Sequence, residues 1–163
     1  MLIGILSDTH DEHFRTRIAV EKLGELGAEA LIHCGDVTTI GILETLSALP
    51  THFVFGNCDR VAELRRGADE FGLTCLGDGG IVEFQGKRLA VTHSHLNSEV
   101  QRLLNEEPDY LFSGHSHIAN VWREGNTRRI NPGALHRAGT YTVGLLNLES
   151  DEFEFIEIPR LLH

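Results

Sequence analysis

Two histidines that stand one residue apart raise the question of what chemistry they serve. His115 and His117 lie in the stretch LFSGHSH, where a short apolar run ends at a glycine. The stretch THSH places His93 and His95 at the same spacing. A single histidine at such a place is usually structural, but a pair beyond the end of a strand points to a further partner, most simply a metal ion.

Carboxylates and one amide follow other apolar runs in the same way. Asp8, Asp36 and Asn57 each come just after such a run, and His10 stands two residues beyond Asp8. In open α/β sheets, ligands bind beyond the carboxyl ends of the strands, so these loops can converge on one point. Carboxylate, imidazole and amide donors together suit Mn, Fe, Zn or Ni better than Ca or Mg.

The number of donors favours two ions over one. The candidate ligands are Asp8, His10, Asp36, Asn57, His93, His115 and His117. They exceed what one tetrahedral ion takes, and two ions can share them if one carboxylate bridges, for which Asp36 is the natural choice. Two ions about 3.5–4 Å apart can bind both sides of an in-line phosphoryl displacement and generate hydroxide at neutral pH. Each motif alone also fits a helix cap or a turn, but the ordered set favours a site.

The elements that must position these residues follow from the apolar periodicity. It predicts βαβ units and then a hairpin around Gln85-Gly86-Lys87. The expected helices are 15–26, 40–49 and 97–105, and the expected strands are 2–6, 30–34, 52–55, 81–84, 88–92, 110–112, 120–123, 128–131, 140–147 and 153–158. We expect an α/β fold, a two-sheet α/β/β/α sandwich with mixed sheets and outer helices, forming a single domain over residues 1–163.

Composition and charge narrow the function classes. The net charge of −10 is spread along the chain and would repel a long nucleic acid, although a small anion remains acceptable where local cations override it. The three cysteines form no CxxC pair and no disulfide framework. No apolar stretch approaches the ~20 residues of a membrane helix, and MLIGILSDTH lacks the basic start of a signal peptide. We expect a cytoplasmic protein without a membrane partner.

Taken together, the motifs resemble the calcineurin-like metallophosphoesterase superfamily. They are Asp8-Thr9-His10, Gly35-Asp36, Gly56-Asn57-Cys58-Asp59, Thr92-His93-Ser94-His95 and Gly114-His115-Ser116-His117. The short length, the sequence GNCD and the later stretch NPGA look like the small bacterial and archaeal phosphodiesterase branch of that superfamily.

The resemblance implies a dinuclear phosphodiesterase that attacks phosphorus of a small phosphodiester with a metal-bound hydroxide. The first ion would be held by Asp8, His10, Asp36 and His117, and the second by Asp36, Asn57, His93 and His115. Mn²⁺ is the expected metal, with Ni²⁺, Fe²⁺ or Zn²⁺ as alternatives. His115 and His117 would thus serve different ions from one loop.

Two positions depart from the family pattern. Cys58 stands where many relatives carry a histidine that protonates the leaving group. We hypothesise that His95 or Asp59 partly replaces that histidine, and we count both, with Asn57, as candidate catalytic residues. Ser94 stands where a glycine is expected, and because serine tolerates positive φ poorly, we expect a slightly rearranged loop.

Other histidines have no partner pattern and are interpreted as surface or satisfied core residues. They are His13, His33, His52, His136 and His163. Three other functions stay open: a monoesterase, a non-catalytic metal-binding scaffold of the same fold that binds proteins, and a metal-bound sensor of nucleotides. The complete ligand set disfavours a pure scaffold. The strands of the C-terminal tail could pair across a homo-oligomer, since exposed strand edges invite pairing.

Overall fold

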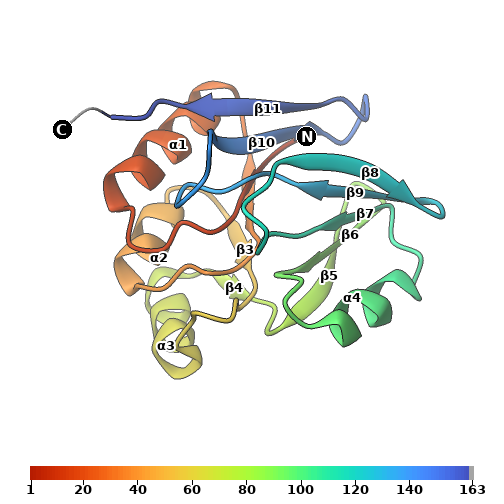
Figure 1. Ribbon diagram of the computed structural model, residues 1–163, viewed down its shortest axis with the longest axis horizontal. Helices are drawn as coiled ribbons and strands as arrows, with labels where there is room; N and C mark the ends of the chain where they lie inside the picture. Colours follow the sequence, from red (N-terminus) through yellow and green to blue (C-terminus); the bar gives the residue numbers. More distant parts are fainter. Residues whose placement is uncertain (162–163) are drawn as a thin grey trace.

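The computed structural model, which describes residues 1–161, contains two mixed β-sheets packed against each other (Figure 1). The first sheet has, in spatial order, β11 (Phe153–Ile158), β10 (Tyr141–Asn147), β1 (Leu2–Leu6), β2 (Ala30–His33), β3 (Thr51–Phe53) and β4 (Thr74–Cys75). The second has β5 (Gly79–Phe84), β6 (Lys87–Thr92), β7 (Tyr110–Phe112), β9 (Thr127–Asn131) and β8 (Asn120–Glu124). In each sheet, parallel central strands have an antiparallel neighbour: β1 pairs with β2 in parallel and with β10 antiparallel.

Helices cover the outer faces of both sheets. The helices α1 (His13–Glu25), α2 (Ile40–Leu46) and α3 (Val61–Phe71) pack on the first sheet, and α4 (Asn97–Leu104) packs on the second (Figure 1). The layer order is therefore helix, sheet, sheet, helix. The predicted α/β/β/α sandwich is confirmed.

Side chains that alternate along each strand separate the layers. In β1, Ile3 and Ile5 point into the core between the sheets, whereas Leu6 belongs to the cluster under α1–α3. In β6, Val91 faces the first sheet and Ala90 faces α4. Burying each larger aliphatic side chain contributes about 1.5–3 kcal/mol, so a one-residue slip of a central strand would lose much of this packing.

Most predicted elements are present with ends shifted by a few residues, but α3 and β4 were not predicted. Gly67 interrupts the α3 pattern, and a Cβ atom there would crowd the side chain of Leu43 in α2 at 2.9 Å. Two signals were available: Leu64 and Ala68 stand four residues apart on the buried face, and Gly72 ends the helix with a left-handed backbone.

The strand ends bring the motif loops together. The parallel strands β1, β2 and β3 deliver the loops that contain Asp8, Asp36 and Asn57 to the same edge. Backbone hydrogen bonds join these loops: the N–H of Asp8 donates to the carbonyl of Gly35 at 3.0 Å, and that of His10 donates to the carbonyl of Asp36 at 3.0 Å. In the second sheet, the N–H of Gly114 donates to the carbonyl of His93 at 3.3 Å and joins the loops after β6 and β7 in the same way.

The side chain of His33 hydrogen-bonds to the loops after β1 and β2. The N–H of Gly35 donates to His33 Nδ1 at 3.2 Å, so the proton of the neutral ring sits on Nε2, which lies 3.0 Å from Thr9 Oγ1 and donates to it. The ring is fully buried, and burial, followed by the charge of His93, lowers the pKa of His33 to about 3. His33 is thus a satisfied core histidine, as interpreted from the sequence.

We expect His33 to make the metal-free protein acid-sensitive. The unfolded chain binds a proton at His33 below its ordinary pKa of 6.5, whereas the folded chain does so only near pH 3, so stability falls as the pH decreases between these values. The loss is roughly 2 kcal/mol by about pH 5. Urea unfolding at neutral pH and at about pH 5 measures this loss of stability. In His33→Gln, which cannot ionise, the pH slope should be shallower by that amount; an unchanged slope would contradict this role.

Candidate metal centre

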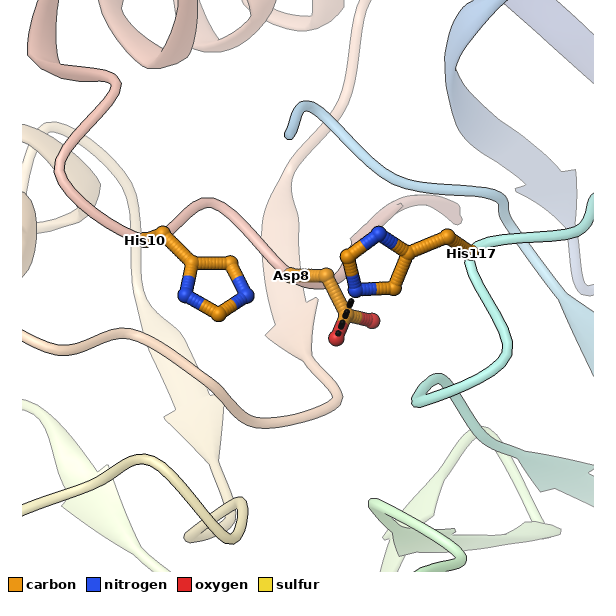
Figure 2. Close-up of side chains that lie close together, drawn as sticks. All are labelled: Asp8, His10 and His117. Carbon is orange, nitrogen blue, oxygen red and sulfur yellow. Dashed lines mark ion pairs between the residues drawn. The ribbon is translucent and has the colours of Figure 1, made fainter. Parts of the chain in front are cut away.

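A buried carboxylate and two imidazoles form one side of the site. Asp8 is fully buried, and its Oδ1 lies 3.1 Å from His117 Nε2. Figure 2 shows this pair and the ring of His10 on the far side of Asp8. Asp8 and His10 come from the loop after β1, and His117 comes from the loop after β7 of the other sheet. The centre therefore spans the seam between the two sheets.

Asp36 faces imidazoles on two sides. Its Oδ2 lies 3.6 Å from His10 Nε2 and 3.2 Å from His93 Nε2. Asn57 adds an amide oxygen, because its Oδ1 lies 3.1 Å from the same His93 nitrogen. A single carboxylate oxygen thus stands between the two nitrogen donors, which is where a bridging ligand belongs.

The outer nitrogens of two histidines are held by backbone carbonyls. His93 Nδ1 lies 2.8 Å from the carbonyl oxygen of Cys34, and His117 Nδ1 lies 3.2 Å from that of Arg137. A donor is needed at each of these nitrogens, so the Nδ1 atoms carry protons, and when the ring is neutral its Nε2 presents a lone pair to the carboxylates. Metal-binding histidines are held in this way.

Among the buried polar atoms that have no hydrogen-bond partner within the described residues, two belong to the carboxylate and imidazole cluster. They are Asp8 Oδ1 and His10 Nε2, and both point into the cluster. Lone pairs of oxygen and nitrogen that face one another without a proton donor repel, and a divalent cation removes that repulsion. The donor set of carboxylate, imidazole and amide groups therefore fits divalent transition-metal ions.

The pKa shifts show a strong coupling between acid and base. Burial opposes ionisation of Asp36, but the hydrogen bond with His93 and the nearby positive charges outweigh burial and hold the pKa of this carboxyl far below its usual range. Burial lowers the pKa of His93, and the carboxylates of Asp36 and Asp8 overcome it and raise that pKa. Burial also lowers the pKa of His10 and of His95. A cation that binds here would take the place of the shared proton.

Glycines let the ligand loops approach one another closely. A Cβ atom on Gly56 would overlap the carboxylate and the backbone nitrogen of Asp36. A Cβ atom on Gly114 would overlap the side chains of Ser7 and Asp8. The glycines that precede Asn57 and His115 in the motifs are therefore explained by contact with the neighbouring ligand loop.

Backbone strain is concentrated at the expected ligands. Left-handed φ angles are uncommon outside glycine and cost on the order of 1–3 kcal/mol each, and they gather at functional sites. The strained positions of the site are Asp8, His10, Asp36, Ser94, His115 and His117. Ser94 keeps the backbone conformation expected of a glycine, with φ of 78°, and its hydroxyl bonds the carbonyl of Gly114 at 3.3 Å.

The structure brings most of the predicted ligands together. Asp8 groups closely with His10 and His117, and Asp8 and Asp36 group with His93. His115 stands further out: its ring centroid is 5.1 Å from that of His93, its side chain is exposed, and its backbone N–H donates to Asp8 Oδ2 at 3.0 Å.

The two candidate proton donors have different surroundings. Both carboxylate oxygens of Asp59 accept backbone N–H groups, from Gly56, Asp36 and Thr38, at 2.7–2.9 Å. Asp59 therefore fastens the loops after β2 and β3 to each other. The ring of His95 is partly exposed and lies 5.4 Å from that of His93, and its Nδ1 has no hydrogen-bond partner within residues 1–161.

Sequence reasoning missed two neighbours of the site. The ring of His136 lies against that of His10, tilted by 39° with centroids 4.4 Å apart, and His136 Nδ1 lies 3.1 Å from a carboxylate oxygen of Glu12. Cys58 groups with His10 and Asp36, and was considered only as the replacement of a histidine. The position of His136, two residues beyond NPGA, was an available signal. His13 is exposed and His52 half-buried, while His163 lies outside the described residues.

Comparisons with known proteins agree with this geometry. The model of the calcineurin-like phosphoesterase superfamily domain matches residues 1–151. The chain belongs to this superfamily. It is 28% identical over 165 residues to phosphodiesterase MJ0936 of Methanocaldococcus jannaschii, covering 96% of this chain and 98% of that protein. It is 33% identical over 165 residues to the probable metallophosphoesterase YsnB of Bacillus subtilis, covering 93% and 86%.

A solved archaeal phosphodiesterase has the same fold. It superposes with a TM-score of 0.87 at 27% identity and covers 97% of this chain and 100% of its own. The resemblance read from the motifs and the class of metal-dependent phosphoesterase are thereby confirmed, and the superfamily implies divalent metal ions. Among residues 1–161, every helix is too short or too polar to span a membrane.

We expect Gly56→Ala to weaken metal binding by at least about tenfold, the scale of disturbing a group that supports a ligand. The new methyl group must displace Asp36, whose backbone nitrogen leaves no room for it. Calorimetric titration of metal-stripped protein with Mn²⁺ measures the change. Gly24→Ala in α1 is the control, because a Cβ atom there meets nothing within 4 Å. Equal affinities in the two variants would show that the close approach at Gly56 is unimportant.

Proposed function

We propose that this chain is a phosphodiesterase with a dinuclear metal centre that hydrolyses small phosphodiesters. The observation that carries the proposal is the position of Asp36, whose Oδ2 faces the Nε2 atoms of both His10 and His93. These nitrogens belong to loops from different sheets, so each can serve its own ion while Asp36 serves both.

The ligand sets proposed are those that the superfamily resemblance implies, and the grouping of the side chains supports them. Asp8, His10, Asp36 and His117 would hold one ion, and Asp36, Asn57, His93 and His115 would hold the other. When bound, the two ions supply Lewis acidity toward phosphate oxygens and hydroxide at neutral pH. Mn²⁺ remains the expected metal, with Ni²⁺, Fe²⁺ or Zn²⁺ as alternatives, since each accepts mixed oxygen and nitrogen donors.

Other groups of the chain orient the metal ligands or can protonate the leaving group. The carbonyls of Cys34 and Arg137 orient His93 and His117, so the Nε2 lone pairs face the centre before an ion arrives. Asp59 holds the loop of Asn57 in place through backbone N–H groups. Because both oxygens of Asp59 are engaged, His95 is the better placed of the two to protonate a leaving group.

Charge and similarity support a small diester as the substrate. The net charge of −10 disfavours a long nucleic acid, whose phosphates would meet a repulsive field outside the centre. The archaeal relative is named a phosphodiesterase and matches almost the whole chain. Action in the cytoplasm and assembly into a homo-oligomer stay predictions.

We expect metal-stripped protein to hydrolyse an aryl phosphodiester only after Mn²⁺ is restored, and faster than the corresponding monoester. Asp36→Asn should lower this turnover by about 10²-fold or more, the scale of removing one preorganised electrostatic group. Release of the aryl alcohol measures the rates. The control is Asp69→Asn, which removes an exposed carboxylate on α3.

Two outcomes would contradict the proposal. Faster turnover of the monoester would assign the chain to the monoesterases. Folded, metal-loaded protein without turnover of either ester would instead favour a scaffold, or a sensor if nucleotides bind tightly.

We expect His95→Ala to slow diesters with poor leaving groups by about 10²-fold or more and aryl diesters far less, since only poor leaving groups need a proton. Burial, together with the charges of His93 and His115, lowers the pKa of His95. The protonated fraction therefore grows only toward acidic pH, and the difference between wild type and variant should widen as the pH falls. Rates for alkyl and aryl diesters across pH test this, with the exposed His13→Ala as control. Full turnover of the alkyl diester by His95→Ala would reject His95.

A further inference from the structure

A thiol lies among the donors of the metal centre, on its solvent side. One nitrogen of His10, one carboxylate oxygen of Asp36 and the Sγ of Cys58 all lie within 4.8 Å of one another. Bonds of about 2.0–2.3 Å place two donors on one ion at most about 4.5 Å apart. Small side-chain rotations are therefore enough to bring nitrogen, oxygen and sulfur onto the same ion.

The residues that would bind metal also fix the thiol. The backbone N–H of Cys58 donates to Asp36 Oδ1 at 2.9 Å, which leaves Oδ2 free to face the imidazoles. The side-chain amide of Asn57 donates to Cys58 Sγ at 3.6 Å. Cys58 is thus held by contacts to two expected ligands, Asp36 at its backbone and Asn57 at its thiol.

A second observation points to a ligand at the same place. Asp8 is fully buried, and its Oδ1 is without a hydrogen-bond partner among residues 1–161, as is the buried Nε2 of His10. The buried side of the site therefore presents ligand atoms that have no partner among residues 1–161, while Cys58 lies on the exposed side. A cation that binds His10 Nε2 on the buried side can also bind Cys58 Sγ on the exposed side.

We propose that Cys58 is an additional metal ligand that is engaged by sulfur-preferring ions and released by hard ones. With Zn²⁺ or Co²⁺, Cys58 Sγ joins His10 and Asp36 on one ion, and the thiol proton leaves to solvent. With Mn²⁺, which prefers oxygen donors, the thiol stays unbound. The inference rests on the proposed metal centre and adds to it a discrimination between classes of metal.

Cys58 lies on the side of the metal centre from which a substrate would reach the ions. Catalytic metal sites keep an open coordination position, whereas structural sites are closed by protein ligands. Asp8, Asp36 and His93 are buried, so a substrate phosphate must approach from the exposed side, where Cys58 stands. A sulfur-preferring ion would therefore close the position that Mn²⁺ leaves to substrate.

Absorption spectra of the Co²⁺-loaded protein test the inference. We expect the wild type to show a sulfur-to-cobalt charge-transfer band beside the visible cobalt bands. Cys58→Ser should lose the charge-transfer band and keep the visible ones, since its other donors remain. The matched control is Cys75→Ser, which removes a partly exposed thiol on β4 and should leave both bands unchanged.

Alkylation measured by mass spectrometry gives a readout that is independent of colour. Iodoacetamide should modify Cys58 readily in metal-free and Mn²⁺-loaded protein, and Zn²⁺ should protect it, while Cys75 reacts alike in every state. Visible cobalt bands without a charge-transfer band, together with equal alkylation of Cys58 in all states, would overturn the inference and leave the metal centre standing. Failure to bind Co²⁺ at all would overturn both.

Discussion

The carboxylate of Asp36 is the group on which the rest of the site depends. Its Oδ1 accepts the backbone N–H of Cys58, and its Oδ2 faces His10 and His93. Its own backbone N–H is held by Asp59. A buried carboxylate surrounded by nitrogen lone pairs is unfavourable unless a proton or a cation lies between them. The surrounding loops hold the Asp36 carboxylate in place, and a bound divalent ion would neutralise its charge.

Holding that arrangement costs conformational energy that the core must offset. Several ligands have left-handed backbones, at on the order of 1–3 kcal/mol each, and Gly56 and Gly114 are needed so that neighbouring loops can touch. The strained loops follow strands whose side chains fill three hydrophobic layers. Strain is tolerated at the strand ends because the strands themselves cannot shift without losing this burial.

The centre also has two sides with different chemistry. Asp8, Asp36 and His93 form a buried floor of hard oxygen and nitrogen donors, while Cys58 and His115 stand toward solvent. The floor is what the superfamily motifs encode. Toward solvent, a thiol lies beside Asp36, and the ring of His136 lies tilted against that of His10.

The sequence by itself determined the layers and predicted the ligands. Short apolar runs that end in Asp8, Asp36 and Asn57 required strands with a common edge, and the paired histidines required a partner at that edge. The local pattern signalled α3 only weakly, through Leu64, Ala68 and Gly72, because Gly67 interrupts its periodicity. It also could not show that Asp59 is engaged by backbone N–H groups or that Cys58 and His136 adjoin the ligands. Those relations join loops that are far apart in the sequence, so only the tertiary structure decided them.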